Sequence, residues 1–118
     1  MAMPPTTLTQ RADFLRLNRG FKYIAPYFIL RYAPTAEAGQ CRVGYTVTTK
    51  CGNAVVRNRI KRRLRALMRE LHAACHPGTD YVLIARADAQ TSAATVEYDL
   101  LRQELARALA AARARLER

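Results

Sequence analysis

The stretch that decides the fold is residues 43–65, which read VGYTVTTKCGNAVVRNRIKRRLR. Apolar and polar residues alternate at its start, which predicts a strand over residues 41–48. A turn follows in which Asn53 is a candidate N-cap, and a helix is predicted from there to about Ala74. Five apolar residues of this helix fall within about an 80° arc and should face the core. They are Val56, Ile60, Leu64, Leu67 and Leu71.

The predicted helix is dense in positive charge. Residues 57–69 contain seven basic side chains, namely Arg57, Arg59, Lys61, Arg62, Arg63, Arg65 and Arg69. Four of them recur at every fourth position, and like charges at that spacing destabilise an isolated helix. This stripe of like charges is expected on a face that binds phosphates, because arginine can bind a phosphate through two N–H donors. Asn58 adds a neutral donor and acceptor. The alternative is a solvated charged face, against which only Glu70 offsets the seven cations.

The rest of the chain supplies a helix before this stretch and further strands around it. Residues 8–18 predict a short helix, and residues 27–33 predict a strand that would form a hairpin with residues 41–48. Residues 80–86 form an apolar run typical of a central strand. Thr95 is the predicted cap of a last helix. The apolar stripe of that helix is Leu101, Leu105, Leu109, Ala112 and Leu116.

The length and composition favour one small domain. The chain has 118 residues, of which 50% are hydrophobic, so a packed core is expected. Residues 1–7 contain two prolines and are predicted to be a loose N-terminal arm, which leaves residues 8–118 as a single domain. The order of elements indicates an α+β fold, an α/β sandwich in which helices cover one or both faces of a small sheet.

The net charge points to a polyanionic partner. With 20 Lys+Arg against 9 Asp+Glu, the formal charge is +11. Binding to nucleic acid would relieve the repulsion among these positive charges. A ribosome-like or membrane-surface role fits the charge alone. No stretch approaches 18 apolar residues, so no membrane span is expected. The N-terminus lacks a secretory pattern and the three cysteines form no C-x-x-C pair, which predicts a cytoplasmic protein.

The full run resembles the signature of the bacterial ribonuclease P protein family, centred on Arg57-Asn58-Arg59 followed by Ile60-Lys61-Arg62. The resemblance extends over residues 11–20, 27–32 and 80–86. It implies a sheet with helices in the order α-β-β-β-α-β-α and a left-handed crossover around the basic helix. It also implies a third early strand, for which residues 21–24 are the candidate.

The resemblance implies a function as well. The catalyst would be an RNA subunit that uses Mg²⁺, bound mainly by the RNA subunit and the substrate, to remove the 5′ leader from precursor tRNA. The protein would be an accessory subunit with no catalytic and no metal-binding residues of its own. It would contact the ribonuclease P RNA subunit and the precursor tRNA leader, without a membrane or a small-molecule substrate.

Two sets of residues carry these contacts by position. The set that would face the RNA subunit is Lys50, Arg57, Asn58, Arg59, Lys61, Arg62 and Arg65. The set that would line a leader cleft between the first helix and the sheet is Phe14, Ile29, Arg31, Thr46 and Thr48. Unpaired bases can stack on aromatic groups without sequence-specific hydrogen bonds. The alternative for Phe14 is an ordinary core residue.

This chain departs from the family pattern at three positions. Asn18 stands where a second aromatic residue is frequent, Arg31 where an aromatic residue is common, and Thr49 where a basic residue is frequent. These departures concern the leader contacts and leave the Arg57–Arg65 core intact. The oligomeric state, the exact RNA contacts and the leader preference do not follow from the sequence.

Two other functions compete with the ribozyme subunit. A general RNA-binding or ribosome-associated protein would share the charge and size but gives no reason for the whole run 43–65. A protein nuclease would need an acidic metal site, and the carboxylates Asp13, Glu70 and Asp80 are scattered. His72 and His76 share a helix face, but a second ligand cluster is lacking in the sequence, so a zinc site is not expected.

Overall fold

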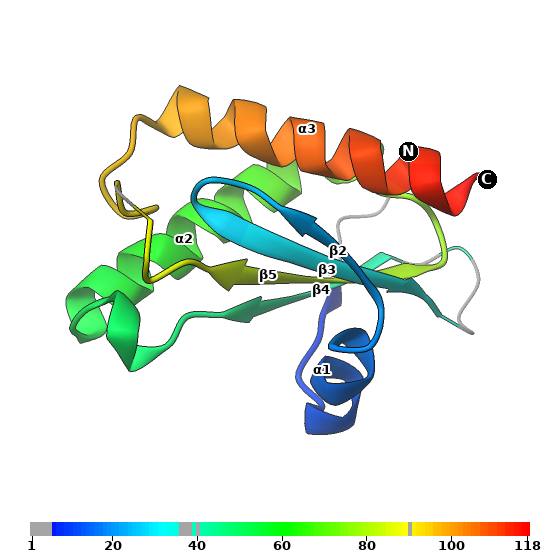
Figure 1. Ribbon diagram of the computed structural model, residues 1–118, viewed down its shortest axis with the longest axis horizontal. Coiled ribbons are helices and arrows are strands. Elements are labelled where there is room, and N and C mark those ends of the chain that lie inside the picture. Colours follow the sequence, from blue (N-terminus) through cyan, green and yellow to red (C-terminus); the bar gives the residue numbers. More distant parts are fainter. Residues whose placement is uncertain (1–5, 36–38, 40, 90) are drawn as a thin grey trace.

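The computed structural model describes residues 6–35, 39, 41–89 and 91–118. Figure 1 shows the arrangement of the helices and strands. In chain order the elements are β1 (Thr6–Thr7), α1 (Arg11–Leu17), β2 (Phe21–Ile24), β3 (Phe28–Pro34), β4 (Cys41–Thr46), the 3₁₀ turn η1 (Thr49–Cys51), α2 (Ala54–Glu70), the 3₁₀ turn η2 (His72–Ala74), β5 (Thr79–Ala85) and α3 (Tyr98–Leu116). From α1 onward the main elements follow the predicted order α-β-β-β-α-β-α, and the predicted early strand at residues 21–24 is confirmed as β2.

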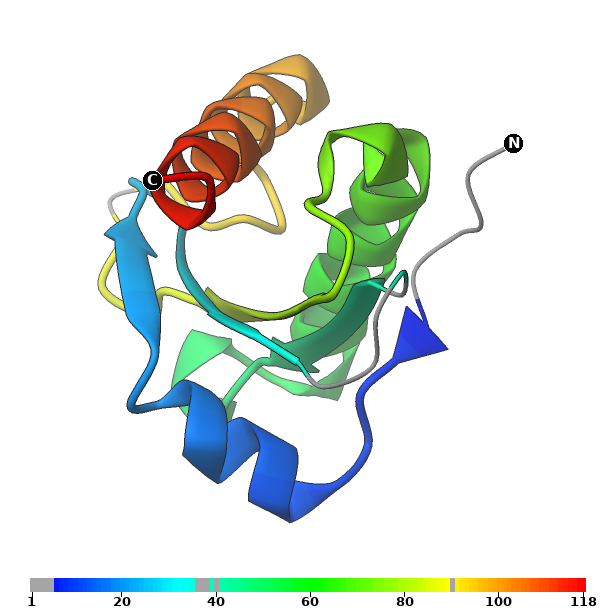
Figure 2. The same cartoon turned by 90° about the vertical axis from the view of Figure 1, so that its right-hand side faces the viewer.

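The strands form one mixed sheet between two layers of helices. Its strand order is β1-β4-β5-β3-β2. Helices α2 and α3 cover one face of the sheet and α1 lies against the other (Figures 1 and 2). β5 pairs antiparallel with β3 and parallel with β4, so β4, α2 and β5 make a parallel crossover around the basic helix.

The predicted hairpin between residues 27–33 and 41–48 is wrong, because β5 lies between the two strands. All the residues of β5 except Ile84 are buried. A strand that is buried on both faces gains most from a central position, where its backbone also pairs on both edges. β3 forms its hairpin with β2 instead, with Phe21 opposite Tyr32 and Ile24 opposite Ile29.

The main core fills the space between the sheet and the helices α2 and α3. The sheet contributes large buried side chains such as Phe28, Leu30 and Tyr81. The predicted apolar stripes of both helices face this core, with Leu64 and Leu105 fully buried. Burying a leucine or phenylalanine side chain stabilises the fold by about 1.5–3 kcal/mol, so this layer fixes α2 against the sheet.

A second, smaller core lies under α1. It consists of the buried Leu8, Leu17 and Val82, with Phe14 packed against them. The ring of Phe14 lies against Gly44 of β4, where an added Cβ would come within 2.6 Å of its Cζ atom. Glycine at this position is therefore what lets α1 approach the sheet so closely.

A buried carboxylate ties α1 to the sheet as well. The side chain of Asp80 is fully buried and accepts bonds from Arg42, whose Nε and Nη2 lie 2.8 and 2.7 Å from its two oxygens. Arg16 of α1 also donates to Asp80, and Asp13 lies 3.5 Å from Arg42 Nη2. Two carboxylates thus face two guanidinium groups, which keeps the cluster neutral where α1 meets the sheet.

Two further expectations differ from the structure. Thr6 and Thr7, predicted within the loose arm, pair with β4 as β1, and the buried Leu8 anchors them; residues 1–5 of that arm lie outside the described residues. Thr95 does not cap the last helix, because its N–H donates to Ser92 O in a turn. The helix begins at Tyr98, after Glu97.

Candidate RNA interface

The basic helix α2 starts from a well-defined cap. Asn53 Oδ1 accepts a hydrogen bond from Val56 N at 3.0 Å, as predicted for an N-cap. Gly52 precedes it with φ at 140°, a conformation that side chains rarely adopt. Lys50 lies exposed in η1 just before this turn, and the exposed Thr48 lies between the end of β4 and η1. Both residues therefore lie in the segment that leads into the first turn of the helix.

The face of α2 that points away from the core carries most of the predicted set. Asn58, Arg62 and Arg65 are exposed there, Lys61 is half-buried, and Arg69 extends the stripe. Arg65 lies over the ring of Tyr45, 5.5 Å from its centroid. Burial raises the pKa of Tyr45 to about 12, against the opposing charge of Arg65, so the phenol is neutral at physiological pH. Among the described residues, none makes an ion pair with the side chains of this face.

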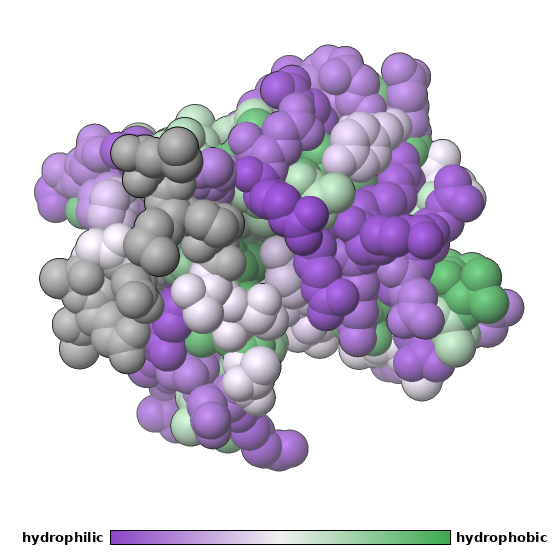
Figure 3. All heavy atoms as spheres, turned by 180° about the vertical axis from the view of Figure 1, so that it is seen from behind, coloured by the Kyte–Doolittle hydropathy of each residue, from purple (hydrophilic) through white to green (hydrophobic). Residues whose placement is uncertain are grey.

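The carboxylate nearest in sequence does not neutralise this face. Glu70, the one acidic residue of α2, accepts a bond from Arg102 Nε of α3 at 2.7 Å. Figure 3 looks onto the back of the molecule, where α2 lies, and hydrophilic side chains cover most of the surface drawn in colour. This face therefore carries positive charges that no carboxylate of the described residues neutralises.

Three cations of α2 lie on its flanks and bond to the protein itself. Arg57 Nε donates to Gly52 O at 3.2 Å. Arg59 Nε donates to Ala94 O at 2.8 Å, and Arg63 donates to the carbonyl oxygens of Ala93 and Val96. Burial, followed by the charge of Arg59, lowers the pKa of Arg63 below its usual value. The predicted members Arg57 and Arg59 therefore combine a place beside the basic face with a role in holding adjacent loops.

On the opposite side of the sheet, three of the predicted cleft residues, Ile29, Arg31 and Thr46, share one face. Thr46 of β4 and Ile29 of β3 are both in register with Ile84 of β5. Ile24 of β2, opposite Ile29 and 57% exposed, completes a row across four strands. Phe14 borders this region from α1. The structure thus brings Phe14, Ile29 and Thr46 onto a common surface that α1 leaves partly open.

Sequence reasoning missed Ile24 and Ile84 in this row. The signal that finds them is register, because residues in line across neighbouring strands point to the same face. The next row holds Lys22 opposite Arg31, with Val82 and Gly44 beyond them. The first row is apolar except for Thr46, and the second begins with two cations.

Two of the three departures from the family pattern, Asn18 and Arg31, contact each other. Arg31 Nη1 donates to the backbone oxygen of Asn18 at 3.0 Å. Its Nε is buried and has no hydrogen-bond partner among the described residues. The guanidinium therefore lies beside the C-terminal end of α1.

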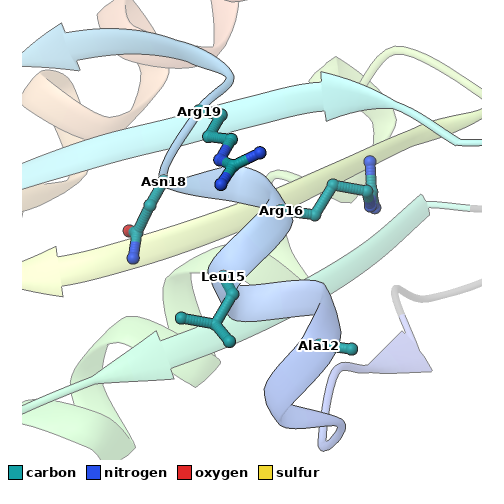
Figure 4. A pocket seen from close by; sticks show the side chains of 5 residues that line it. All are labelled: Ala12, Leu15, Arg16, Asn18 and Arg19. Atoms are coloured by element: carbon teal, nitrogen blue, oxygen red, sulfur yellow. The ribbon is translucent and has the colours of Figure 1, made fainter.

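Helix α1 also has an open outer surface. A pocket of about 500 Å³ is lined by Ala12, Leu15, Arg16, Asn18 and Arg19. Figure 4 shows these side chains along α1 and at its C-terminal end. Leu15 is 52% exposed, so α1 offers apolar surface next to positive charge on this side too.

Comparison with known proteins agrees with these features. Residues 3–113 match the family model described as Ribonuclease P. A ribonuclease P protein component from Erythrobacter litoralis is 44% identical over 119 residues, covering 96% of this chain and 90% of that protein. One from Bartonella quintana is 45% identical over 92 residues, covering 72% and 69%.

Solved structures agree as well. The RNase P protein of Staphylococcus aureus superposes with a TM-score of 0.75 at 28% identity, covering 90% of this chain and 94% of that one. The RNase P protein from Thermotoga maritima gives a TM-score of 0.76 at 27% identity, covering 88% and 94%. With the capped basic helix and the β-α-β-β-β-α-β-α order in place, the chain belongs to the ribonuclease P protein family, whose members are protein components of an endoribonuclease that processes tRNA.

Proposed function

We propose that this chain binds the ribonuclease P RNA subunit through the outward face of α2 and assists removal of the 5′ leader from precursor tRNA. The observation that carries the proposal is the array of α2 cations that no described carboxylate neutralises. Six or so phosphate contacts would make binding strongly dependent on salt. The residues proposed to face the RNA subunit are Lys50, Arg57, Asn58, Arg59, Lys61, Arg62 and Arg65.

The leader is proposed to lie on the sheet face beside α1. The row from Thr46 through Ile84 and Ile29 to Ile24 is apolar for most of its length. Unpaired bases can pack on such a surface without a sequence code, while Arg31 and Lys22 suit the phosphates. Phe14, Ile29, Arg31, Thr46 and Thr48 are the proposed leader contacts.

The metal ions of the reaction are proposed to be Mg²⁺ bound mainly by the RNA subunit and the substrate. In the part of the chain that the structure describes, no group of three or more His, Cys, Asp or Glu residues could hold a metal ion. The buried Asp80 is already bonded to Arg16 and Arg42. The role proposed for the protein is therefore to position RNA, with the chemistry left to the RNA subunit.

A cytoplasmic location is proposed for the same assembly. Cys41, Cys51 and Cys75 are free thiols, as is usual in a reducing compartment. None of the described helices is long and apolar enough to cross a lipid bilayer.

The test is cleavage of precursor tRNA at low Mg²⁺ by a bacterial ribonuclease P RNA, with and without this protein. The protein should raise single-turnover cleavage and do nothing alone. Arg62→Ala and Arg59→Ala should each reduce the effect, with Arg62→Ala leaving the stability of the fold unchanged. Arg107→Ala, an exposed arginine of α3, is the matched control and should behave as the unchanged protein.

Other outcomes would favour the competing functions. RNA binding without any stimulation of cleavage would favour a general RNA-binding protein. Cleavage by the protein alone would favour a nuclease and contradict the proposed division of labour.

A further inference from the structure

An exposed aromatic residue lies on the edge strand β2, on the face opposite the proposed leader cleft. Phe21 is 37% exposed, and its ring centroid lies 5.4 Å from that of Tyr32. The guanidinium of Arg115, near the C-terminal end of α3, lies 4.6 Å from the Phe21 centroid. A guanidinium stacked on a ring keeps its N–H donors at the rim and one planar face open. This cluster can therefore hold a phosphate and stack against a base.

The positive charge of this cluster is not neutralised by described carboxylates. Arg115 makes no ion pair there, and Glu117 is paired with Arg113 at 3.3 Å. Burial raises the pKa of Tyr32, while the charges of Arg115 and Arg118 oppose that rise. Arg118 follows the last turn of α3, where its N–H donates to Arg115 O at 3.4 Å. We call Phe21, Tyr32, Arg115 and Arg118 the edge cluster.

The edge cluster is continuous with the cleft around β2. Because side chains alternate along a strand, β2 directs Lys22 and Ile24 to the cleft and Phe21 to the α3 side. Lys22 pairs in register with Arg31 and Phe21 with Tyr32. β2 is the last strand of the sheet, so a polymer can pass around it (Figure 2).

The direction of the leader follows from where the RNA subunit is proposed to sit. The start of α2 and Lys50 follow β4, so the scissile bond should lie near the β4 end of the apolar row. From there to β2 the row crosses three interstrand gaps, about 14 Å in all. A leader that starts at β4 and crosses the sheet would reach the β2 edge within a few nucleotides.

We propose that the part of the leader beyond the cleft turns around β2 and binds the edge cluster, with a phosphate on Arg115 and a base stacked on its guanidinium. This inference rests on the proposed function. It predicts that the protein distinguishes precursors by leader length, because only a leader long enough to pass β2 gains the added contact. The added contact is electrostatic in part and should weaken with salt.

The experiment measures the dissociation constant of precursor tRNA from the reconstituted holoenzyme as the leader is lengthened one nucleotide at a time. With unchanged protein, affinity should rise when the leader fills the cleft and rise again when it passes β2. Arg115→Gln, alone and with Arg118→Gln, should remove the second rise and keep the first. Arg107→Gln, with the same charge change on the same helix, should keep both.

Salt dependence gives a second readout. Each phosphate contact with a single strand contributes a slope of about −0.7 in log affinity against log salt, so a fourfold rise in salt weakens it by about 2.6-fold. The long-leader precursor should show this extra slope with unchanged protein and lose it with Arg115→Gln. Phe21→Leu, which keeps an apolar side chain but removes the ring beneath Arg115, should weaken the second rise.

Three outcomes would overturn the inference: no second rise with unchanged protein, a second rise that survives Arg115→Gln/Arg118→Gln, or an equal loss at every leader length. An equal loss of affinity at every leader length would mean that these arginines contact the RNA subunit or the tRNA body. Failure of the proposed function looks different, because the protein would then fail to improve binding or cleavage at any leader length.

Discussion

Arg63 shows how a cation of α2 can serve the fold rather than the RNA-binding face. It donates to the carbonyl oxygens of Ala93 and Val96 and lies 5.5 Å from the ring centroid of Tyr98. The loop before α3 is thereby fastened to the basic helix. Arg62 is exposed, whereas its neighbour Arg63 is half-buried. Two consecutive arginines of α2 therefore have different roles.

Arg63→Ala should therefore destabilise the protein. Two backbone carbonyls would lose their partner, and a buried acceptor left unsatisfied costs about 1–3 kcal/mol. Urea unfolding measures the change. Arg62→Ala is the control and should stay within about 0.5 kcal/mol of the unchanged protein. Equal effects of the two substitutions would contradict the assignment of Arg63 to the fold.

Gly44→Ala should also destabilise the protein, by a different cause. The added Cβ would lie 2.6 Å from Phe14 Cζ, so the ring and α1 must shift. Overpacking of this kind costs about 1–3 kcal/mol, which thermal unfolding would reveal. Phe14→Leu in the same chain should recover part of the loss, since the two sites are in contact. A Gly44→Ala protein as stable as the original would show that α1 does not need this close approach.

At the scale of elements, α1 is short and depends on its attachments. Its seven residues are fewer than an isolated helix needs in water. The small apolar core under α1 and the bonds from Arg16 and Arg42 to Asp80 provide the stability that intrinsic helix propensity does not. The position of α1 also sets how much of the leader surface stays open.

Asp80→Asn should loosen α1 in particular. Removing one partner of a buried ion pair costs about 3–5 kcal/mol, and the low end is expected because Arg16 is 40% exposed. Hydrogen exchange should speed up in α1 before it does in α2. Asp88→Asn, which removes an exposed carboxylate paired with Arg86, is the control. It should leave hydrogen exchange unchanged in both helices. Uniform acceleration in both helices would mean that Asp80 supports the sheet as a whole.

The elements that sequence predicted well are those determined locally. The Asn53 cap and the buried faces of α2 and α3 follow from spacing within one segment, and the structure confirms them. The strand pairing could not follow, because the partner of each β4 residue comes 38 residues later in the chain, as in Cys41 with Thr79. β1 was not predicted because its two threonines are too few to show the alternation of polar and apolar residues that indicates a strand. The start of α3 was misplaced because Ser92, rather than Thr95, organises the preceding turn.

The same division holds for the candidate site. The cations of α2 were evident as a run, whereas the fact that Arg59 and Arg63 bond to residues 93–96 depends on tertiary contacts. On the sheet, Ile29 and Thr46 were named, while Ile24 and Ile84 required the register. The edge cluster joins residues from β2 and α3 that lie far apart in sequence.

At the scale of the whole molecule, charge is distributed by face. Several arginines are matched with acids, as in Arg16 with Asp80, Arg102 with Glu70 and Arg113 with Glu117. The cations left over among the described residues gather on α2, beside the cleft and around the edge cluster. The net charge of +11 is thus concentrated on particular surfaces and is not spread evenly over the molecule.

Binding to the RNA subunit should fall steeply with salt. With about six phosphates neutralised, affinity should drop by about 10³-fold between 50 and 200 mM salt. Arg62→Gln and Arg65→Gln should each make the slope of log affinity against log salt shallower by about 0.9, as one lost phosphate contact does for a duplex. Arg107→Gln should leave the slope unchanged. Slopes unaffected by all three substitutions would place the RNA on another surface.

The central position of β5 has a consequence for how the chain folds as it is made. β2 and β3 can pair as soon as both have left the ribosome, but β4 must wait for residues 79–85 and, meanwhile, has a neighbour only in β1. The basic helix is synthesised before the strand that fixes it against the sheet. Non-local pairing of this kind slows folding and leaves strand edges exposed. A nascent chain of this protein therefore exposes the cations of α2 before its core has formed.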